Sequence, residues 1–112
     1  LRQAQRYPSL PISTNVKGVV SLYDVSDDWI PIYDKSDLPG YYMAIGTSGN
    51  QFKNAPVAGV LMSELVEYCE KGNDHDNKPL SINLKYINKD INLKFYSRNR
   101  EINKESSMSV LG

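Results

Sequence analysis

The stretch from residue 41 to residue 72 constrains the fold of this chain more than any other part of the sequence. Tyr41–Ile45 is a compact apolar run that predicts a β-strand, and a polar loop with two glycines follows it at residues 46–51. Residues 54–71 then repeat apolar side chains at helical spacing. A strand, a short loop and a one-sided helix form a unit that needs a sheet around it, so the sequence predicts an α/β fold.

The helix predicted at residues 54–71 has suitable residues at both ends. Asn54 is expected to be its N-cap, Pro56 falls in the first turn where proline is tolerated, and Gly72 is placed to end it. Its apolar face is made of Val57, Ala58, Leu61, Met62, Leu65, Val66, Tyr68 and Cys69. Its polar face carries Glu64, Glu67, Glu70 and Lys71. We therefore expect the apolar face to be buried.

The residues before this unit predict short extended pieces joined by turns. Val16–Val25 is rich in β-branched and aromatic residues and predicts a strand, followed by a polar turn at Ser26–Trp29. Ile30–Tyr33 contains a proline, which fits only the edge or the end of a strand. Asp34–Gly40 predicts a second turn. Residues 1–15 contain two prolines and predict a connector or a helix end.

The residues after Gly72 predict a separate hairpin region. Ser81–Ile87 and Ile91–Ser97 both alternate apolar and polar residues, with Asn88–Asp90 as the turn between them. Residues 98–112 are mostly polar and predict an extended tail. The predicted organisation is thus one part at 1–72, with the strand, loop and helix at 41–71, and a hairpin with a tail at 73–112.

Length and composition exclude several classes of protein. The chain has 112 residues, enough for one ordinary domain, and its 13 Lys and Arg balance 13 Asp and Glu. Neutrality argues against a general nucleic-acid partner, and no apolar run approaches the roughly 20 residues of a membrane span. The single Cys69 excludes a disulfide or a cysteine zinc cluster within one chain, which fits a reducing, cytoplasmic setting. The chain opens at Leu1 without a Met, so we expect a fragment.

Other polar residues predict local structure better than chemistry. His75 lies between two aspartates after the helix stop, where three adjacent residues converge poorly on one metal ion, and a solvated turn is the favoured interpretation. Asp27 and Asp28 resemble paired carboxylates, but consecutive side chains point apart and turn formation explains them better. Cys69 and Trp29 are interpreted as packing residues. No metal site is predicted.

Two blocks of the sequence resemble the D-amino-acid oxidase superfamily of FAD-dependent oxidoreductases, which includes sarcosine oxidase and dimethylglycine dehydrogenase. The first block is LYDVSDDWIPI at residues 22–32, and the second is GTSGNQFKNAP at residues 46–56. In the family the second block follows a strand, contacts the flavin and opens a helix. The similarity covers roughly residues 6–72, and residues 97–112 resemble the tail of some bacterial members less distinctively.

The resemblance implies roles for individual residues. It implies that the loop formed by Gly46, Thr47, Ser48, Gly49, Asn50, Gln51 and Phe52 contacts FAD, although an ordinary strand-to-helix turn would also use these glycines. It implies that Lys53 binds the carboxylate of the substrate, with a solvated lysine as the alternative. Tyr23 stands where glycine and D-amino-acid oxidases have a carboxylate-binding arginine, which favours a secondary-amine substrate. Tyr23 is a possible substrate contact or a packed strand residue, and Ser21, where sarcosine oxidases have a flavin-linking cysteine, argues against covalent attachment there.

One departure from the family limits what this chain can do alone. The family binds the FAD pyrophosphate with a G-x-G-x-x-G motif, and this sequence has none. The resemblance therefore implies the C-terminal portion of a Rossmann-like FAD-binding domain, α+β when isolated and catalytically silent without the nucleotide-binding half. The expected parent oxidises the C–N bond of an amino acid or a sarcosine-like amine. The alternative is a non-enzymatic module that associates with itself through its open sheet edges and the Val57, Leu61 and Leu65 stripe.

Overall fold

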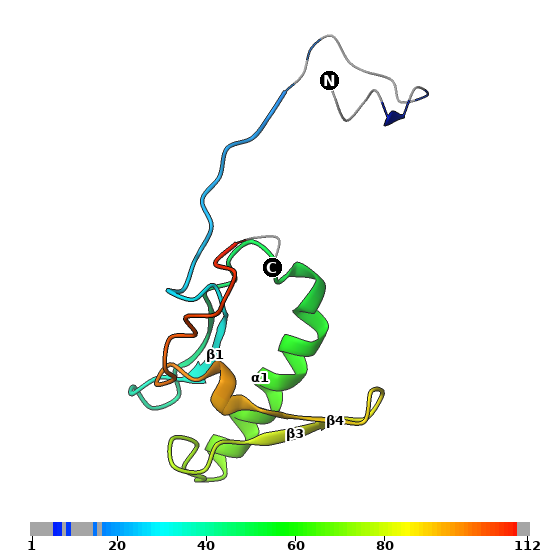
Figure 1. Ribbon diagram of the computed structural model, residues 1–112. Helices are drawn as coiled ribbons and strands as arrows, with labels where there is room; N and C mark the ends of the chain where they lie inside the picture. The colour runs from blue at the N-terminus through cyan, green and yellow to red at the C-terminus, as the bar shows by residue number, and fades with distance from the viewer. Residues whose placement is uncertain (1–5, 8, 10–14, 16, 110–112) are drawn as a thin grey trace.

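The protein is a small α+β structure with one α-helix and two separate two-stranded antiparallel sheets among the described residues (Figure 1). The computed structural model describes residues 6, 7, 9, 15 and 17–109. The first sheet pairs β1 (Ile32–Lys35) with β2 (Tyr42–Ile45), and the second pairs β3 (Ser81–Leu84) with β4 (Lys89–Asn92). The helix in the described part of the chain is too short and too polar to span a membrane.

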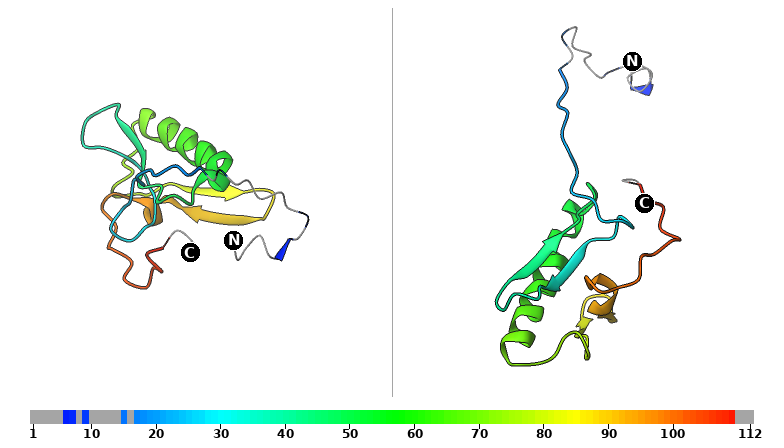
Figure 2. Two further views of the ribbon diagram at one scale, coloured as in Figure 1. Left: turned by 90° about the horizontal axis from the view of Figure 1, so that it is seen from above. Right: turned by 90° about the vertical axis from the view of Figure 1, so that its left-hand side faces the viewer.

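The first sheet is a hairpin that lies along the helix (Figure 2). Ile32 pairs with Ile45 and Lys35 with Tyr42, and the turn closes where the Ser36 N–H donates to the Tyr41 carbonyl at 2.8 Å. The turn contains Gly40 in the left-handed region, at φ 75°. The strand prediction at 41–45 is confirmed within one residue. The prediction at 30–33 placed the partner strand two residues too early.

The helix α1 (Ala55–Glu70) follows the short 3-10 turn η2 (Phe52–Asn54), which confirms the prediction of a helix over this stretch. Gly72, at φ 82°, ends it and donates its N–H to the Cys69 carbonyl at 2.9 Å. Asn54 occupies the N-cap position, but its side chain makes no capping hydrogen bond. Its amide Nδ2 instead donates to Gln51 Oε1 at 2.9 Å. Asn54 therefore stands at the predicted N-cap position but does not cap the helix with its side chain.

Among the described residues, four buried apolar side chains form the core: Tyr33 of β1, Leu61 and Leu65 of α1, and Leu93. Each fully buried leucine contributes about 1.5–3 kcal/mol of hydrophobic stabilisation. Around them lie partly buried side chains, namely Tyr42, Ala58, Met62, Cys69, Leu80, Ile82, Ile91 and Tyr96. The centre of the predicted helix stripe is therefore buried. Its first residue, Val57, is 40% exposed.

The second sheet confirms the predicted hairpin but shortens both strands. The chain turns at residues 85–88, with Asn88 at φ 48°, so Tyr86 lies fully exposed in the turn rather than in a strand. The predicted second strand over 91–97 is wrong beyond Asn92, because the chain coils there into the 3-10 turn η3 (Leu93–Tyr96). The side chain of Asn92 accepts the Lys94 N–H at 2.8 Å and starts this turn. It carries Leu93 into the core and packs Tyr96 against Tyr33, with ring centroids 5.1 Å apart and ring planes tilted by 43°.

The strand predicted at Val16–Val25 is wrong over residues 17–25, while residue 16 lies outside the described residues. The first part of this segment is extended and leads away from the body of the protein, whereas Tyr23 and Asp24 contact the loop after β2 (Figure 1). Val19, Val20 and Leu22 are each at least 95% exposed. Its β-branched residues favour extended backbone, but a strand also needs a partner, and no described strand pairs with this segment.

Candidate functional site

The predicted flavin-contacting loop, residues 46–52, joins β2 to η2 and includes Phe52, the first residue of η2. Gly46, Ser48 and Gly49 have φ values of 67°, 53° and 75°, all in the left-handed region. Glycine adopts this region without steric cost, whereas Ser48 does so under strain. The Ser48 side chain is completely buried, and its hydroxyl donates to the Gly46 carbonyl at 3.0 Å. The loop is therefore a specific structure rather than a simple connection.

Asp24 holds this loop from a segment that is neither helix nor strand. Its carboxylate Oδ2 accepts the N–H of Gly46 at 2.6 Å, and its backbone carbonyl accepts the N–H of Ser48 at 2.7 Å. A Cβ placed on Gly46 would lie 3.1 Å from the Cβ of Ser26, so the two segments touch closely there. Sequence reasoning included Asp24 in a family block but gave it no role. An aspartate before a polar turn carries no local signal of such a contact.

Tyr23 lies against the same loop. A Cβ placed on Gly49 would come within 2.7 Å of Tyr23 Cε1, so a larger residue at this position would require the ring to move. Tyr23 therefore faces Gly49 while Ser26 faces Gly46, and the two segments pass each other in opposite directions. The structure thus brings Tyr23 together with the predicted flavin loop. The ring remains 57% exposed.

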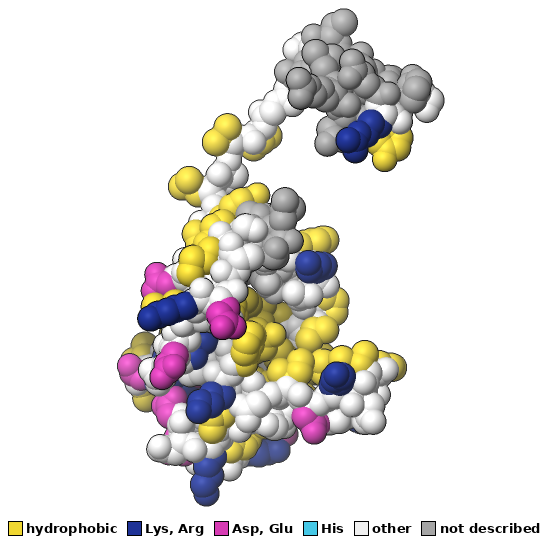
Figure 3. Space-filling model, viewed as in Figure 1, with side chains coloured by type: hydrophobic (Ala, Val, Ile, Leu, Met, Phe, Trp, Pro, Cys, Tyr) yellow, Lys and Arg dark blue, Asp and Glu magenta, His cyan; other side chains and the backbone are white. Residues whose placement is uncertain are grey.

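A hollow of about 450 Å³ opens beside the loop. Small residues of β2, the loop and α1 form much of its wall, and two aromatic side chains complete it; the lining is Tyr33, Ala44, Thr47, Gly49, Gln51, Phe52, Ala55 and Ala58. Phe52 is 96% exposed. Figure 3 shows hydrophobic side chains exposed on the face viewed there and along the extended segment. A flat apolar ligand could approach the backbone closely here.

Several backbone donors of the loop are left without a protein partner. The amides of Thr47, Gly49 and Gln51 have no hydrogen-bond acceptor among the described residues. All three residues line the hollow, which extends along the first turn of α1 to Ala55 and Ala58. The N-terminus of a helix carries about half a positive charge. Unpaired amides and a helix N-terminus together favour a ligand that presents acceptor atoms or negative charge.

Lys53, the predicted carboxylate ligand, lies in η2 at the beginning of the helix. Its side chain is exposed, and its ammonium forms no ion pair within the described part of the chain. No contact joins Lys53 to Tyr23, so the structure does not bring these two predicted substrate residues together. Lys53 is next to the loop only because it directly follows the loop in the sequence.

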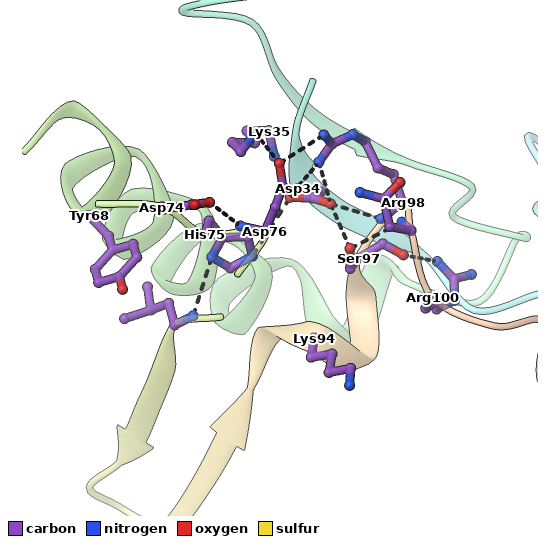
Figure 4. Close-up of polar contacts among 12 residues, drawn as sticks. Asp34, Lys35, Tyr68, Asp74, His75, Asp76, Lys94, Ser97, Arg98 and Arg100 are labelled. Atoms are coloured by element: carbon purple, nitrogen blue, oxygen red, sulfur yellow. Dashed lines mark hydrogen bonds and ion pairs between the residues drawn. The ribbon is translucent and has the colours of Figure 1, made fainter. Parts of the chain in front are cut away.

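A second polar cluster surrounds Asp34 and contradicts the prediction that His75 is a solvated turn residue (Figure 4). Asp34 is completely buried and accepts hydrogen bonds from the Ser97 hydroxyl and from the backbone and side chain of Arg98. His75 is only 1% exposed, and its Nε2 lies 3.7 Å from Asp34 Oδ1. Its Nδ1 accepts the Leu80 N–H at 3.3 Å. Burial lowers the pKa of His75 despite the nearby carboxylates.

Asp28 forms a matching anchor at the other end of β1. It is 1% exposed and accepts Arg100 Nη2 at 2.6 Å and the backbone N–H of Ile30 at 3.1 Å. Burial alone would raise the pKa of Asp28, but hydrogen bonds from Arg100, Asn103 and Ile30 outweigh burial and hold the pKa well below its usual value. The predicted turn at 26–29 is confirmed by the 3.1 Å bond from the Trp29 N–H to the Ser26 carbonyl. The role of Asp28 was missed, because its partners Arg100 and Asn103 lie more than 70 residues further along the chain.

Among the described residues, no three His, Cys, Asp or Glu side chains are grouped so that they could hold a metal ion. Comparisons of the chain with family models, with curated proteins and with solved structures find no match. The resemblance to flavin oxidoreductases therefore depends on the two sequence blocks alone. The geometry of the loop is independent of that resemblance.

Proposed function

We propose that this chain is the flavin-contacting C-terminal part of an FAD-dependent oxidoreductase that oxidises the C–N bond of an amino acid or a sarcosine-like secondary amine. The observation that carries the proposal is the loop at 46–52. It combines left-handed glycines, unpaired amides and a hollow walled by small side chains, immediately before a helix N-terminus. The Rossmann-like character of the parent domain belongs to the same proposal. The division of the chain into a part at residues 1–72 and a part at residues 73–112 also belongs to this proposal.

The residues around the hollow fit an isoalloxazine edge. The amides of Thr47, Gly49 and Gln51 would hold it, and the small side chains Ala55 and Ala58 leave room for a planar ring. When bound, FAD would accept a hydride from the substrate carbon next to nitrogen, which leaves an imine that hydrolyses. The loop amides and the start of α1 would favour negative charge on the ring edge, an effect of about 0.3–1 kcal/mol for an exposed helix end.

Lys53 would bind the carboxylate of the substrate. Its ammonium is free of any ion pair in the described part of the chain, so it is available for a charge-assisted contact. The Tyr23 ring packs on Gly49, and its contribution in this proposal is to bound the loop while its exposed part faces outward. Because Tyr23 is neutral, Lys53 would be the single cation that contacts the substrate, and this favours substrates whose carboxylate needs only one cation.

The test compares this chain alone with a polypeptide that joins it to the nucleotide-binding half. FAD fluorescence should show no micromolar binding by the chain alone, and sarcosine should leave the added flavin oxidised. The joined polypeptide should purify with flavin that an N-methyl amino acid bleaches under anaerobic conditions. A joined polypeptide that folds but retains no flavin would overturn the proposal. Tight FAD binding by the isolated chain would overturn its assignment as a silent part.

The second candidate function is a non-enzymatic module that associates with itself. The extended residues 17–25 favour it, because Val19, Val20 and Leu22 are almost completely exposed. Both two-stranded sheets also have unpaired edges within the described residues. An extended apolar segment and open edges are the elements of strand addition between copies.

A further inference from the structure

The feature that carries a further inference is the pair of hydrogen bonds from the loop to Asp24. Gly46 and Ser48 both turn their backbone N–H groups toward this one residue, at 2.6 and 2.7 Å. Ser48 holds a left-handed conformation that serine rarely adopts, so surrounding contacts must maintain it. The Asp24 contacts and the buried Ser48 hydroxyl supply these constraints.

The amides bonded to Asp24 alternate along the loop with amides that remain unpaired. Gly46 and Ser48 donate to Asp24, while Thr47 and Gly49 have no acceptor among the described residues. Thr47 and Gly49 are also the loop residues that line the hollow on this side. Asp24 therefore takes up one set of donors and leaves the other set available to a ligand.

We propose that Asp24 is a positioning residue, which fixes the loop so that the Thr47 and Gly49 amides are presented to the flavin. The inference depends on the proposed function for the identity of the ligand. The dependence of the loop on Asp24 can be tested without any flavin. Asp24 is exposed outside the core, so removing its carboxylate should change the loop without opening a cavity.

The first experiment compares the 112-residue chain with its Asp24 variants by NMR. It follows the backbone amides of Gly46 and Ser48, because both donate to Asp24. In Asp24→Ala, the Gly46 amide should shift and exchange with solvent at least about tenfold faster, since a lost hydrogen bond of about 1.4 kcal/mol corresponds to that factor. The Ser48 amide donates to the backbone carbonyl of residue 24, which alanine keeps, so it should shift less, as the loop around it loosens. Asp24→Asn, which keeps an acceptor oxygen, should show smaller changes.

Asp27→Asn is the matched control, because Asp27 is an exposed aspartate three residues away and makes no hydrogen bond with the loop among the described residues. It should leave both amides unchanged. Unchanged Gly46 and Ser48 amides in a folded Asp24→Ala chain would overturn the inference.

The second experiment uses the joined polypeptide with its flavin. Asp24→Ala should lower the rate constant of flavin reduction at saturating substrate by about tenfold, as expected when a contact is misplaced by a fraction of an ångström. The dissociation constant of the substrate should change less than twofold, because Asp24 does not contact substrate in this proposal. Asp24→Asn should recover most of the rate.

The outcomes separate the inference from the proposed function. A reduction rate that Asp24→Ala leaves unchanged overturns the positioning role while the flavin function remains. A joined polypeptide without flavin overturns the function and the role in reduction. In that case altered Gly46 and Ser48 amides would still establish that Asp24 shapes the loop.

Discussion

The carboxylate of Asp34 and the guanidinium of Arg98 meet inside the protein, at 3.2 Å, although 64 residues separate them in the chain. Arg98 also donates its backbone N–H to the same oxygen at 2.8 Å and reaches Asp76 with its side chain at 2.9 Å. These contacts raise the pKa of Arg98 further above its ordinary value. Arg98, which follows the second hairpin, thus neutralises the buried carboxylate of Asp34 in the first hairpin.

Replacing Arg98 by Met should therefore destabilise the protein strongly. The change leaves the buried carboxylate of Asp34 without its cation, and breaking a buried pair in this way costs about 3–5 kcal/mol. The measurement is the free energy of unfolding from urea denaturation at pH 7. Lys71→Met is the control, because its pair with Glu67 is exposed and its loss should barely move the midpoint. Equal midpoints for the two variants would refute a structural role for the Asp34 pair.

The stability of the protein should fall as the pH drops below about 6.5, the ordinary pKa of histidine, because of His75. Burial lowers the pKa of His75 in the folded state, so the unfolded chain binds the proton more readily. The contribution is complete above the unfolded pKa and is lost as the pH falls toward the folded value. Protonation would also break the hydrogen bond that Nδ1 accepts from Leu80.

Urea midpoints measured between pH 8 and pH 5 isolate this effect. Hydrogen bonds from Arg98 and Lys35 lower the pKa of Asp76 to about 2, so that carboxylate stays charged throughout the interval. His75→Gln should flatten the profile over this range. A variant that keeps the slope of the original protein would assign the slope to other groups.

Gly49→Ala should destabilise the loop, whereas Gly59→Ala should stabilise the helix. An alanine at Gly49 would combine a φ of 75° with a Cβ 2.7 Å from the Tyr23 ring, and the left-handed conformation alone costs about 1–2 kcal/mol. Gly59 has open space around it in α1, where alanine is favoured by about 1 kcal/mol. In thermal unfolding, Gly49→Ala should lower the melting temperature and Gly59→Ala should raise it.

The part of the Gly49→Ala effect that comes from the ring can be separated with Tyr23. In a Tyr23→Ala background, Gly49→Ala should cost less than in the original protein, because only the backbone strain remains. An identical cost in both backgrounds would show that the ring does not press on this position.

Lys53→Met should weaken substrate binding in the joined, flavin-containing polypeptide. The loss of a charge-assisted contact of about 1.5–3 kcal/mol corresponds to a dissociation constant roughly 10- to 150-fold higher. The flavin content should remain nearly the same, because the proposed flavin contacts come from other residues. Anaerobic titration with sarcosine measures the constant, and Lys78→Met, an exposed lysine beyond α1, is the control. Unaltered affinity would remove the carboxylate role from Lys53.

The isolated chain should associate with itself in a concentration-dependent way. Val20 is 98% exposed in an extended segment without a described partner strand, and such a segment readily adds to an open sheet edge. Val20→Lys should shift the chain toward the monomer in gel filtration with light scattering. Leu38→Lys, which removes an exposed leucine from the β1–β2 turn, should leave the association unchanged. A chain that stays monomeric at high concentration would exclude the self-associating module.

The elements that could be predicted from the sequence are those whose causes are local. The Leu61 and Leu65 spacing with the Gly72 stop defined α1, and the glycines at 46 and 49 defined the loop. The segment at 16–25 has local strand propensity without a partner, which no local pattern can reveal. Asn92 similarly ended β4 through a side-chain cap that its alternating neighbours did not indicate.

The contacts that could not be predicted join residues far apart. His75 was interpreted as solvated because its sequence neighbours are polar, yet its surroundings come from β1 and from residues after the second hairpin. The loop lies where the sequence predicts it, but Tyr23 was named only as a possible substrate contact or packed strand residue, and its contact with Gly49 was not foreseen. Asp24 acquires its role only through the fold, since its partners Gly46 and Ser48 lie more than 20 residues away.

The two buried carboxylates are made long before the arginines that neutralise them, and this order matters for folding during synthesis. Asp28 and Asp34 leave the ribosome early, but Arg100 and Arg98, which neutralise them, follow 72 and 64 residues later. Until residues 98–100 emerge, these carboxylates lack the arginines that neutralise them in the folded protein. Leu61 and Leu65 are made earlier and lack the cover that Leu93 provides, so this interval is the stage at which a chaperone would matter most.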